Sequence, residues 1–150
     1  MSHDEFICTL IGRTQNILLK NYKAETRKFD LTPMQLGVLR KLYEEEDGLN
    51  ASELVKRLLS DSSTMMLVID HLEEKGLVKR QTDPNDRRVY HIILTEKAKK
   101  ILPEAIEQTD KVNKFIHDNF SDKEIKTLRS CLIRIYDHVS AIHNDRKKKG

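Results

Sequence analysis

The chain is 150 residues long, 38% hydrophobic and 34% charged, which suits one helix-rich globular domain with a core of its own. No stretch approaches the roughly 20 apolar residues that span a bilayer, so we expect no membrane segment. The net charge of +3 arises in the last third, whereas residues 48–97 carry eight basic and eight acidic side chains. Global charge therefore does not by itself argue for a nucleic-acid partner.

The N-terminus and the cysteines bear on the compartment. The first five residues are polar and acidic, unlike a secretory signal peptide. Cys8 and Cys131 form neither a CxxC pair nor a disulfide framework. We therefore expect a cytoplasmic protein with reduced thiols.

Residues 4–28 are predicted to form an amphipathic helix, because apolar side chains recur there at helical spacing. These side chains are Ile7, Leu10, Ile11, Ile17 and Leu18. A second helix begins at Thr32, which can cap it, with Pro33 at the first helical position and Gln35 completing a capping box. Asp47 and Gly48 are expected to end this helix.

Two more helices follow closely. The run from Asn50 to Glu53 forms a second capping box and opens a short helix. Residues 61–75 form the next helix, whose inner face carries Met65, Ile69 and Leu72, and Gly76 stops it. Two helices separated by so few residues are typical of a helix-turn-helix.

Two strands are predicted next, over residues 77–82 and 89–94, the second rich in β-branched side chains. Turn-forming residues lie between them at 83–86. A hairpin with a charged loop directly after a helix-turn-helix defines a winged helix. The predicted fold class is therefore mainly α with a small β-hairpin wing, that is, a winged helix-turn-helix plus a helical dimerisation region.

The C-terminal third is predicted to contain two helices. Thr95 can cap a helix whose apolar stripe continues to Asn119. A third capping box at Ser121 opens the last helix, whose stripe reaches Ile142. The basic tail 144–150 is expected to be frayed.

We interpret residues 1–150 as a single domain in three parts. Residues 32–94, the DNA-binding part, can close a small core of their own. The flanking helices, 4–28 and 96–143, carry long apolar stripes that need a partner, which predicts a homodimer. The alternative is a monomeric bundle of these helices.

Three motifs resemble the MarR family of transcription regulators. They are Leu72–Arg80 (LEEKGLVKR), Asp83–Arg88 (DPNDRR) and Leu94–Lys97 (LTEK). The resemblance covers the whole chain in element order, with Ala98 standing where the family usually has Gly. It implies a regulator that binds double-stranded DNA.

The wing and the helix-turn-helix supply the candidate DNA contacts. An Arg at a wing tip can enter the narrow, electronegative minor groove. The resemblance assigns Arg88 to DNA and Asp86 to shaping the wing, and we expect Asp86 to orient the Arg88 guanidinium. The remaining candidates are Arg87 in the wing, Ser52, Lys56 and Arg57 in the first helix of the pair, and Ser62, Ser63, Thr64, Met66 and Leu67 in the recognition helix.

Met66 and Leu67 depart from the family, which commonly has Thr and Arg at these positions. Either both side chains contact thymine methyl groups, or one of them turns into the protein. Their apolar character keeps a second function open, namely a winged-helix protein–protein interaction module without specific DNA binding.

Effector binding is suggested by the family alone, since its members commonly respond to small phenolic or lipophilic ligands or to oxidants. Cys8 lies 24 residues before Thr32, a spacing similar to that of the reactive cysteine in the peroxide-sensing branch, and Tyr22 matches one tyrosine of that branch. The alternative is a buried, inert Cys8, and we expect Cys131 to be a core residue. Tyr22 and Tyr43 are ligand-pocket candidates by position, although ordinary core tyrosines are the simpler interpretation.

The sequence indicates no enzyme. It contains no phosphate loop, nucleophile elbow or Cys/His cluster, so neither catalysis, a metal site nor a cofactor is expected. The predicted function is a sequence-specific regulator, a repressor that binds a pseudo-palindromic operator as a homodimer and is released by a small ligand or an oxidant.

Overall fold

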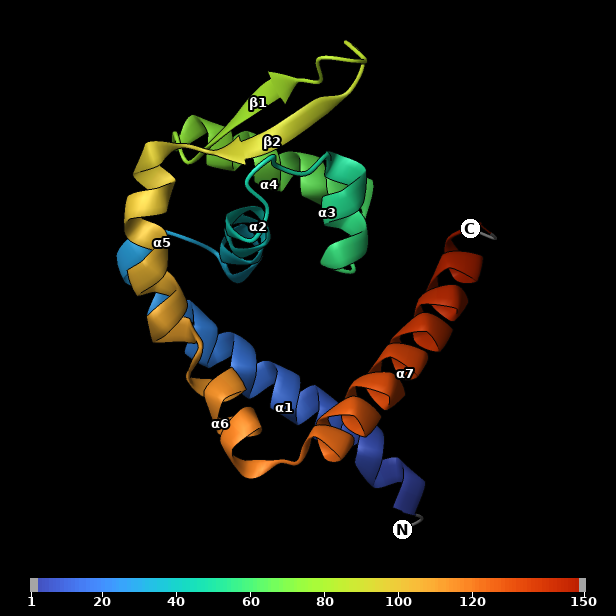
Figure 1. The fold of residues 1–150 in the computed structure, drawn as a ribbon. Coiled ribbons are helices and arrows are strands. Elements are labelled where there is room, and N and C mark those ends of the chain that lie inside the picture. Colours follow the sequence, from blue (N-terminus) through green and yellow to red (C-terminus); the bar gives the residue numbers. More distant parts are fainter. Residues whose placement is uncertain (1–2, 149–150) are drawn as a thin grey trace. The chain divides into compact units, whose positions relative to one another are not determined.

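The computed structural model describes residues 3–148 and divides the chain into two units, Met1–Thr109 and Asp110–Gly150. The first unit is mostly helical, and its two strands form a hairpin (Figure 1). In chain order its elements are α1 (His3–Thr26), the 3-10 helix η1 (Arg27–Phe29), α2 (Pro33–Tyr43), α3 (Ala51–Arg57), α4 (Ser62–Glu74), β1 (Val78–Thr82), β2 (Tyr90–Leu94) and α5 (Glu96–Thr109). The second unit consists of α6 (Lys111–Asn119) and α7 (Asp122–Lys148). The mainly helical fold with a two-stranded wing is confirmed.

The predicted helix starts are present in the structure. Thr32 and Gln35 form the capping box of α2, each side chain accepting a hydrogen bond from the other residue's backbone N–H, at 3.2 and 3.1 Å. Asn50 and Glu53 do the same for α3, at 2.9 and 2.8 Å. Because these bonds satisfy N–H groups that an α-helix leaves free, they fix where each helix begins.

The hairpin is antiparallel, with Val78 opposite Leu94 and Thr82 opposite Tyr90. A third segment joins it, since Leu49 forms an isolated bridge with Ile92 through backbone bonds of 2.8 and 3.1 Å. Gly48 makes this approach possible: its φ is +80°, and a Cβ there would lie 2.5 Å from the backbone oxygen of Ile92. The prediction that Asp47 and Gly48 end the preceding helix is wrong, since α2 ends at Tyr43, and sequence reasoning missed this bridge.

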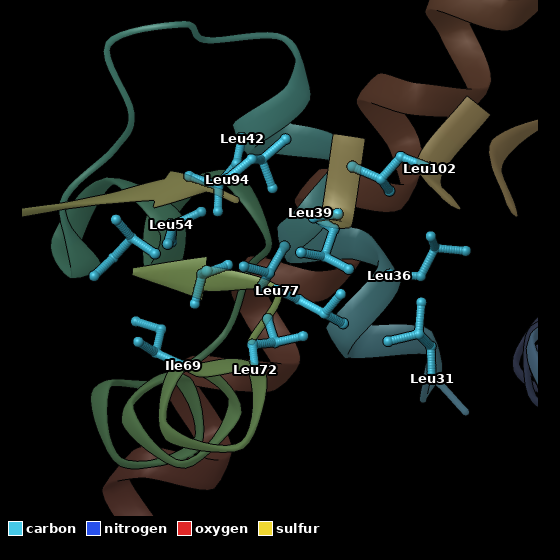
Figure 2. Packing of buried hydrophobic residues seen from close by; sticks show 14 of the residues in the cluster. Leu31, Leu36, Leu39, Leu42, Leu54, Ile69, Leu72, Leu77, Leu94 and Leu102 are labelled. Atoms are coloured by element: carbon cyan, nitrogen blue, oxygen red, sulfur yellow. The ribbon is translucent and has the colours of Figure 1, made fainter. Parts of the chain in front are cut away.

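The core of the first unit is centred on α2, which packs against α1, α3, α4, α5 and β2. Leu36, Leu39 and Leu72 are fully buried there (Figure 2). Leu102 and Ala98 of α5 are also fully buried. The core therefore extends beyond residues 32–94 and needs α5, whose close packing suits the small Ala98 side chain.

The second unit differs from expectation in two ways. The helix predicted to run from Thr95 to Asn119 is broken at Asp110. At the end of α5 the Thr109 hydroxyl donates to the backbone oxygens of Ala105 and Ile106, at 2.8 and 3.2 Å. At the other end, α7 continues to Lys148, so the expected fraying from residue 144 is wrong up to that point, and residues 149–150 lie outside the described part.

Apolar side chains of α7 are exposed within its own unit, and none of its residues is buried. Leu128 is 48% exposed and Val139 57%. Cys131 is exposed too, so the prediction that Cys131 is a core residue is wrong for the single chain.

The capping box predicted at Ser121 is present at the start of α7, with Glu124 accepting from the Ser121 N–H at 2.8 Å. Among the helices of residues 3–148, none is long and apolar enough to cross a bilayer.

Candidate nucleic-acid interface

Helix α4 presents two different faces. Met65, Ile69 and Leu72 are buried, as predicted. Met66 is 44% exposed and Leu67 60%, so the alternative in which one of them turns into the protein is wrong. A helix held by one apolar face while its other face is open to solvent has the geometry of a recognition helix.

The N-terminus of α4 is organised by Asp61. One carboxylate oxygen accepts the Thr64 backbone N–H and the other accepts the Thr64 hydroxyl, both at 2.8 Å. Ser62 and Ser63 are exposed beside this cap. The first turn therefore offers serine hydroxyls and N–H groups to a phosphate, while the Thr64 hydroxyl proton is already used.

Arg80 of β1 joins the wing to the recognition helix. Its Nη2 lies 2.5 Å from Asp70 Oδ1, and its Nη1 contacts Glu73 Oε2. Asp70 and Glu73 are three residues apart and so share one face of α4. The sequence placed Arg80 in a motif without a role, and the spacing of the two acids was the signal that could have revealed this contact.

The end of α4 is also fixed to its surroundings. Lys75 Nζ contacts the Asp30 backbone oxygen and lies 3.4 Å from Gln35 Oε1. The Thr95 hydroxyl donates to the Gly76 oxygen at 2.7 Å, and Lys97 Nζ donates to the Lys75 oxygen at 2.7 Å. The residues of the Leu72–Arg80 and Leu94–Lys97 motifs thus have a structural role, which is to hold the recognition helix, β1 and α5 in a fixed arrangement.

The wing tip is built by two aspartates. Asp83 Oδ1 accepts the backbone N–H groups of Asn85 and Asp86, at 2.7 and 3.2 Å. Asp86 Oδ1 accepts the backbone N–H of Arg88 at 3.0 Å. The expectation that Asp86 orients the Arg88 guanidinium is therefore corrected, because Asp86 bonds to the backbone of Arg88. This bond fixes the backbone that carries the exposed side chains of Arg87 and Arg88.

Asp83 also connects the tip to β2, since its Oδ2 lies 2.8 Å from Nε2 of His91. The Asn85 N–H and the His91 contact lower the pKa of the Asp83 carboxyl below its ordinary value, because both favour the charged form. Sequence reasoning treated both residues as turn or strand positions only. An ionised Asp83 is thus the central acceptor of the wing.

A hollow of about 400 Å³ lies between the wing, the start of α3 and α4. Arg80 and Arg88 line it together with Ser52, Met66 and Tyr90. Because Arg80 is paired with Asp70 and Glu73, Arg88 is the lining arginine that suits the sugar–phosphate strand between a minor and a major groove. Tyr90, 51% exposed, was not among the predicted contacts.

The α3 candidates are not equivalent. Ser52 and Lys56 are exposed. Arg57 is exposed as well, but its Nη1 lies 2.6 Å from Glu45 Oε1. The hydrogen bond with Glu45 raises the pKa of Arg57 and engages part of its guanidinium, so Arg57 is the least available of the three for a phosphate.

The two redox candidates are not brought together in one chain. Cys8 is exposed, so within a single chain it is not the buried packing residue of the alternative interpretation. Tyr22 is half-buried and packs against the core. Both lie on α1, 14 residues apart, which is about 21 Å along a helix. Tyr43 is 48% exposed and so is no core tyrosine. Among the side chains of residues 6–148, no three or more His, Cys, Asp or Glu come together in a group that could hold a metal ion.

A helix-turn-helix followed by a basic-tipped hairpin is a winged helix, the class of fold that this chain shares with many DNA-binding proteins. The MarR family model matches residues 31–90. The regulator SarZ of Staphylococcus aureus, described as an HTH-type transcriptional regulator, is 31% identical over 136 residues, covering 88% of this chain and 90% of SarZ. The chain therefore belongs to the MarR family and is a DNA-binding transcription regulator, a function without catalysis.

Solved structures agree on the fold. CouR from Rhodococcus jostii RHA1, bound to p-coumaroyl-CoA, has a TM-score of 0.78 and 25% identity, over 91% of this chain and 95% of CouR. The S. aureus MepR–DNA complex has a TM-score of 0.75 and 22% identity, over 92% and 98% of the two chains. These matches show the fold, and the similarity to SarZ and to the MarR family model favours the regulator over the alternative of a protein–protein interaction module.

Proposed function

We propose that the protein is a homodimeric repressor that occludes a pseudo-palindromic operator and releases it on binding a small ligand or on oxidation. The single observation that carries the proposal is the joining of the wing to the recognition helix through Arg80. It holds two DNA-contacting elements at a fixed separation, with a hollow lined by Arg88 between them. Such a unit can contact a minor groove, the intervening backbone and a major groove at once.

Each candidate residue has a place in this arrangement. Arg88 enters the minor groove, Arg87 contacts the groove or its phosphates, and Asp86 shapes the wing. Ser52 and Lys56 contact the backbone, with Arg57 in a lesser part because of Glu45. Ser62, Ser63 and Thr64 face phosphates or base edges, and Met66 and Leu67 face base edges.

The homodimer follows from unpartnered apolar surface. On α1, Phe6 and Ile17 are 55% and 54% exposed, and on α7 the stripe from Leu128 to Ile142 is exposed along its length. Soluble proteins rarely leave such stripes in water. We therefore assign residues 32–94 to DNA binding within a single 1–150 domain, 4–28 and 96–143 to dimerisation, and 144–150 to a basic tail.

The release step is supported by a relative and by one thiol. CouR was solved with an aromatic acyl-CoA, which favours a phenolic or lipophilic ligand for this chain as well. The exposure of Cys8 supports the oxidant alternative. In that case Tyr22 can approach Cys8 only from the second chain, since the two are far apart on one α1. A regulator of this kind acts in the cytoplasm.

Selection of bound sequences from random duplex DNA tests the proposal. We expect enrichment of a site with two inverted half-sites about one helical turn apart. Sedimentation at micromolar concentration should give twice the mass of one chain. If the selection enriches no sequence, operator binding is contradicted. If sedimentation gives the mass of one chain, the assignment of α1 and α7 to a dimer is contradicted.

A further inference from the structure

The recognition helix has an unusual composition for a protein that recognises DNA sequence. Its residues Ser62–Glu74 read SSTMMLVIDHLEE and include no Arg, Lys, Asn or Gln. Those four side chains make the paired hydrogen bonds by which proteins distinguish guanine and adenine in the major groove. Base recognition by α4 must therefore use other chemistry.

Two acidic side chains of α4 and the hydroxyl of Thr64 are engaged inside the protein, whereas Ser62 and Ser63 at its first turn stay exposed. Asp70 and Glu73 both contact Arg80. The Thr64 hydroxyl donates to Asp61 at 2.8 Å. Asp70 and Glu73 are thus turned to the wing and kept from accepting hydrogen bonds from cytosine amino groups.

The middle of the helix exposes two apolar side chains, Met66 and Leu67. Leu67 lies two residues from both Met65 and Ile69, about 200° around the helix from each, and so points away from the buried face. It is 60% exposed. Met66, 44% exposed, is turned toward the hollow at the wing. Together they form an apolar surface at the point where α4 enters a groove.

One base edge matches this surface. The C5-methyl group of thymine is the apolar group that B-DNA displays in the major groove. Burying it against a Leu or Met side chain removes apolar surface from water on both sides, which favours binding without any charge. A cytosine or uracil at the same place offers a hydrogen in place of the methyl and loses this contact.

We propose that Met66 and Leu67 recognise thymine methyl groups, so that each half-site carries thymine at the positions beneath these two side chains. The inference rests on the operator binding proposed above and specifies what the recognition helix recognises. It makes Met66 and Leu67 the determinants of base preference in the major groove, while the arginines of the wing supply the salt-dependent part of the affinity.

The test uses the full-length protein and the half-site obtained by selection. Each thymine of the site is replaced in turn by 2′-deoxyuridine, which removes only the methyl group, and affinity is measured by fluorescence anisotropy. We expect about four-fold weaker binding for each methyl group that contacts the patch. In Leu67→Ala or Met66→Ala the same replacement should then have no effect at the corresponding position.

Two variants serve as controls. Leu67→Met keeps an apolar contact and should retain sensitivity to deoxyuridine. Leu59→Ala removes a leucine that is 52% exposed in the turn before α4, and it should retain the wild-type sensitivity at every position. Because all these side chains are exposed, unchanged thermal melting confirms that each variant is folded.

The outcomes separate this inference from the proposed function. A selected site in which no deoxyuridine replacement weakens binding by more than about 1.5-fold overturns the thymine assignment and leaves operator binding intact, since one buried methyl is worth more than that. Equal sensitivity in wild type and in both alanine variants also overturns it. A selection that enriches no sequence contradicts operator binding itself, and the thymine assignment with it.

Discussion

The Asp86 carboxylate accepts a hydrogen bond from the backbone N–H of Arg88 at 3.0 Å, so it acts on the backbone that carries the arginine. We expect Asp86→Ala to weaken DNA binding about five-fold, because the tip loses one of the bonds that define it. Asp86→Asn should retain most of the affinity, since an amide oxygen accepts the same bond. Titration by anisotropy distinguishes the two variants. Equal loss in both would show that the charge of Asp86, and not its bond to Arg88, matters.

Arg88→Ala is expected to reduce both DNA affinity and its salt dependence. Each lost phosphate-type contact lowers the slope of log K against log salt by about 1. Because Arg88 is exposed, the fold should be unaffected. Affinities measured at several salt concentrations check this. Arg57→Ala is the matched comparison, and its pairing with Glu45 predicts a smaller change in slope. An unchanged slope for Arg88→Ala would contradict the placement of the wing in the DNA interface.

Gly48→Ala should destabilise the protein by about 3 kcal/mol. The residue has φ +80°, and a methyl group would lie 2.5 Å from the backbone oxygen of Ile92, which cannot move without breaking the bridge to Leu49. Gly76→Ala is the control, because Gly76 has φ +68° but nothing within 4 Å of the added Cβ. Its expected cost is only about 1 kcal/mol, from backbone conformation. Chemical denaturation measures both, and similar losses would argue against the close approach at Ile92.

The stability of the wing should depend on the ionisation of Asp83. Its pKa is lowered in the folded state by the N–H of Asn85 and by His91. A lowered folded-state pKa contributes stability that is present above the unfolded-state value, about 3.9, and is lost as the pH falls through the folded-state value. Wild type should therefore have a higher Tm than Asp83→Ala at neutral pH, and the difference should shrink below about pH 4. A carboxyl NMR titration should place the Asp83 pKa below the ordinary value of an aspartate. A value at or above it would contradict the bonding pattern.

Cys8 provides the test of oxidant release. If its exposed thiol senses peroxide, hydroperoxide should dissociate the wild-type protein from DNA. Cys8→Ser should stay bound under the same treatment and bind normally without it. Cys131→Ser is the control, since Cys131 is the other exposed thiol and is not expected to respond. Identical behaviour of wild type and Cys8→Ser would direct the search for an effector to small ligands.

Local signals predicted most of the elements correctly. Capping boxes at Thr32, Asn50 and Ser121 are encoded within four residues, so pattern and structure agree there. Contacts between elements were less predictable. The attachment of Arg80 to α4 depends on how β1 leaves the turn at Gly76, and the bridge of Leu49 to Ile92 joins residues 43 positions apart.

The errors have physical reasons as well. The helix break at Asp110 was missed because the apolar stripe continues on both sides of it, from Ile106 to Val112. Cys131 was expected in a core because it lies in an apolar stripe, yet a stripe shows only that a surface seeks a partner, not that the same chain supplies it.

Arg80 makes the wing and the recognition helix one stiff body, and this divides two properties of the regulator between separate parts of the chain. In the proposed function, residues of α4 and the wing tip within that body set which bases are preferred. Release from DNA would then depend on elements outside it. Base preference and inducibility can then change independently. A regulator with this fold can come to respond to a new effector while it keeps its operator, or come to bind a new operator while it keeps its effector.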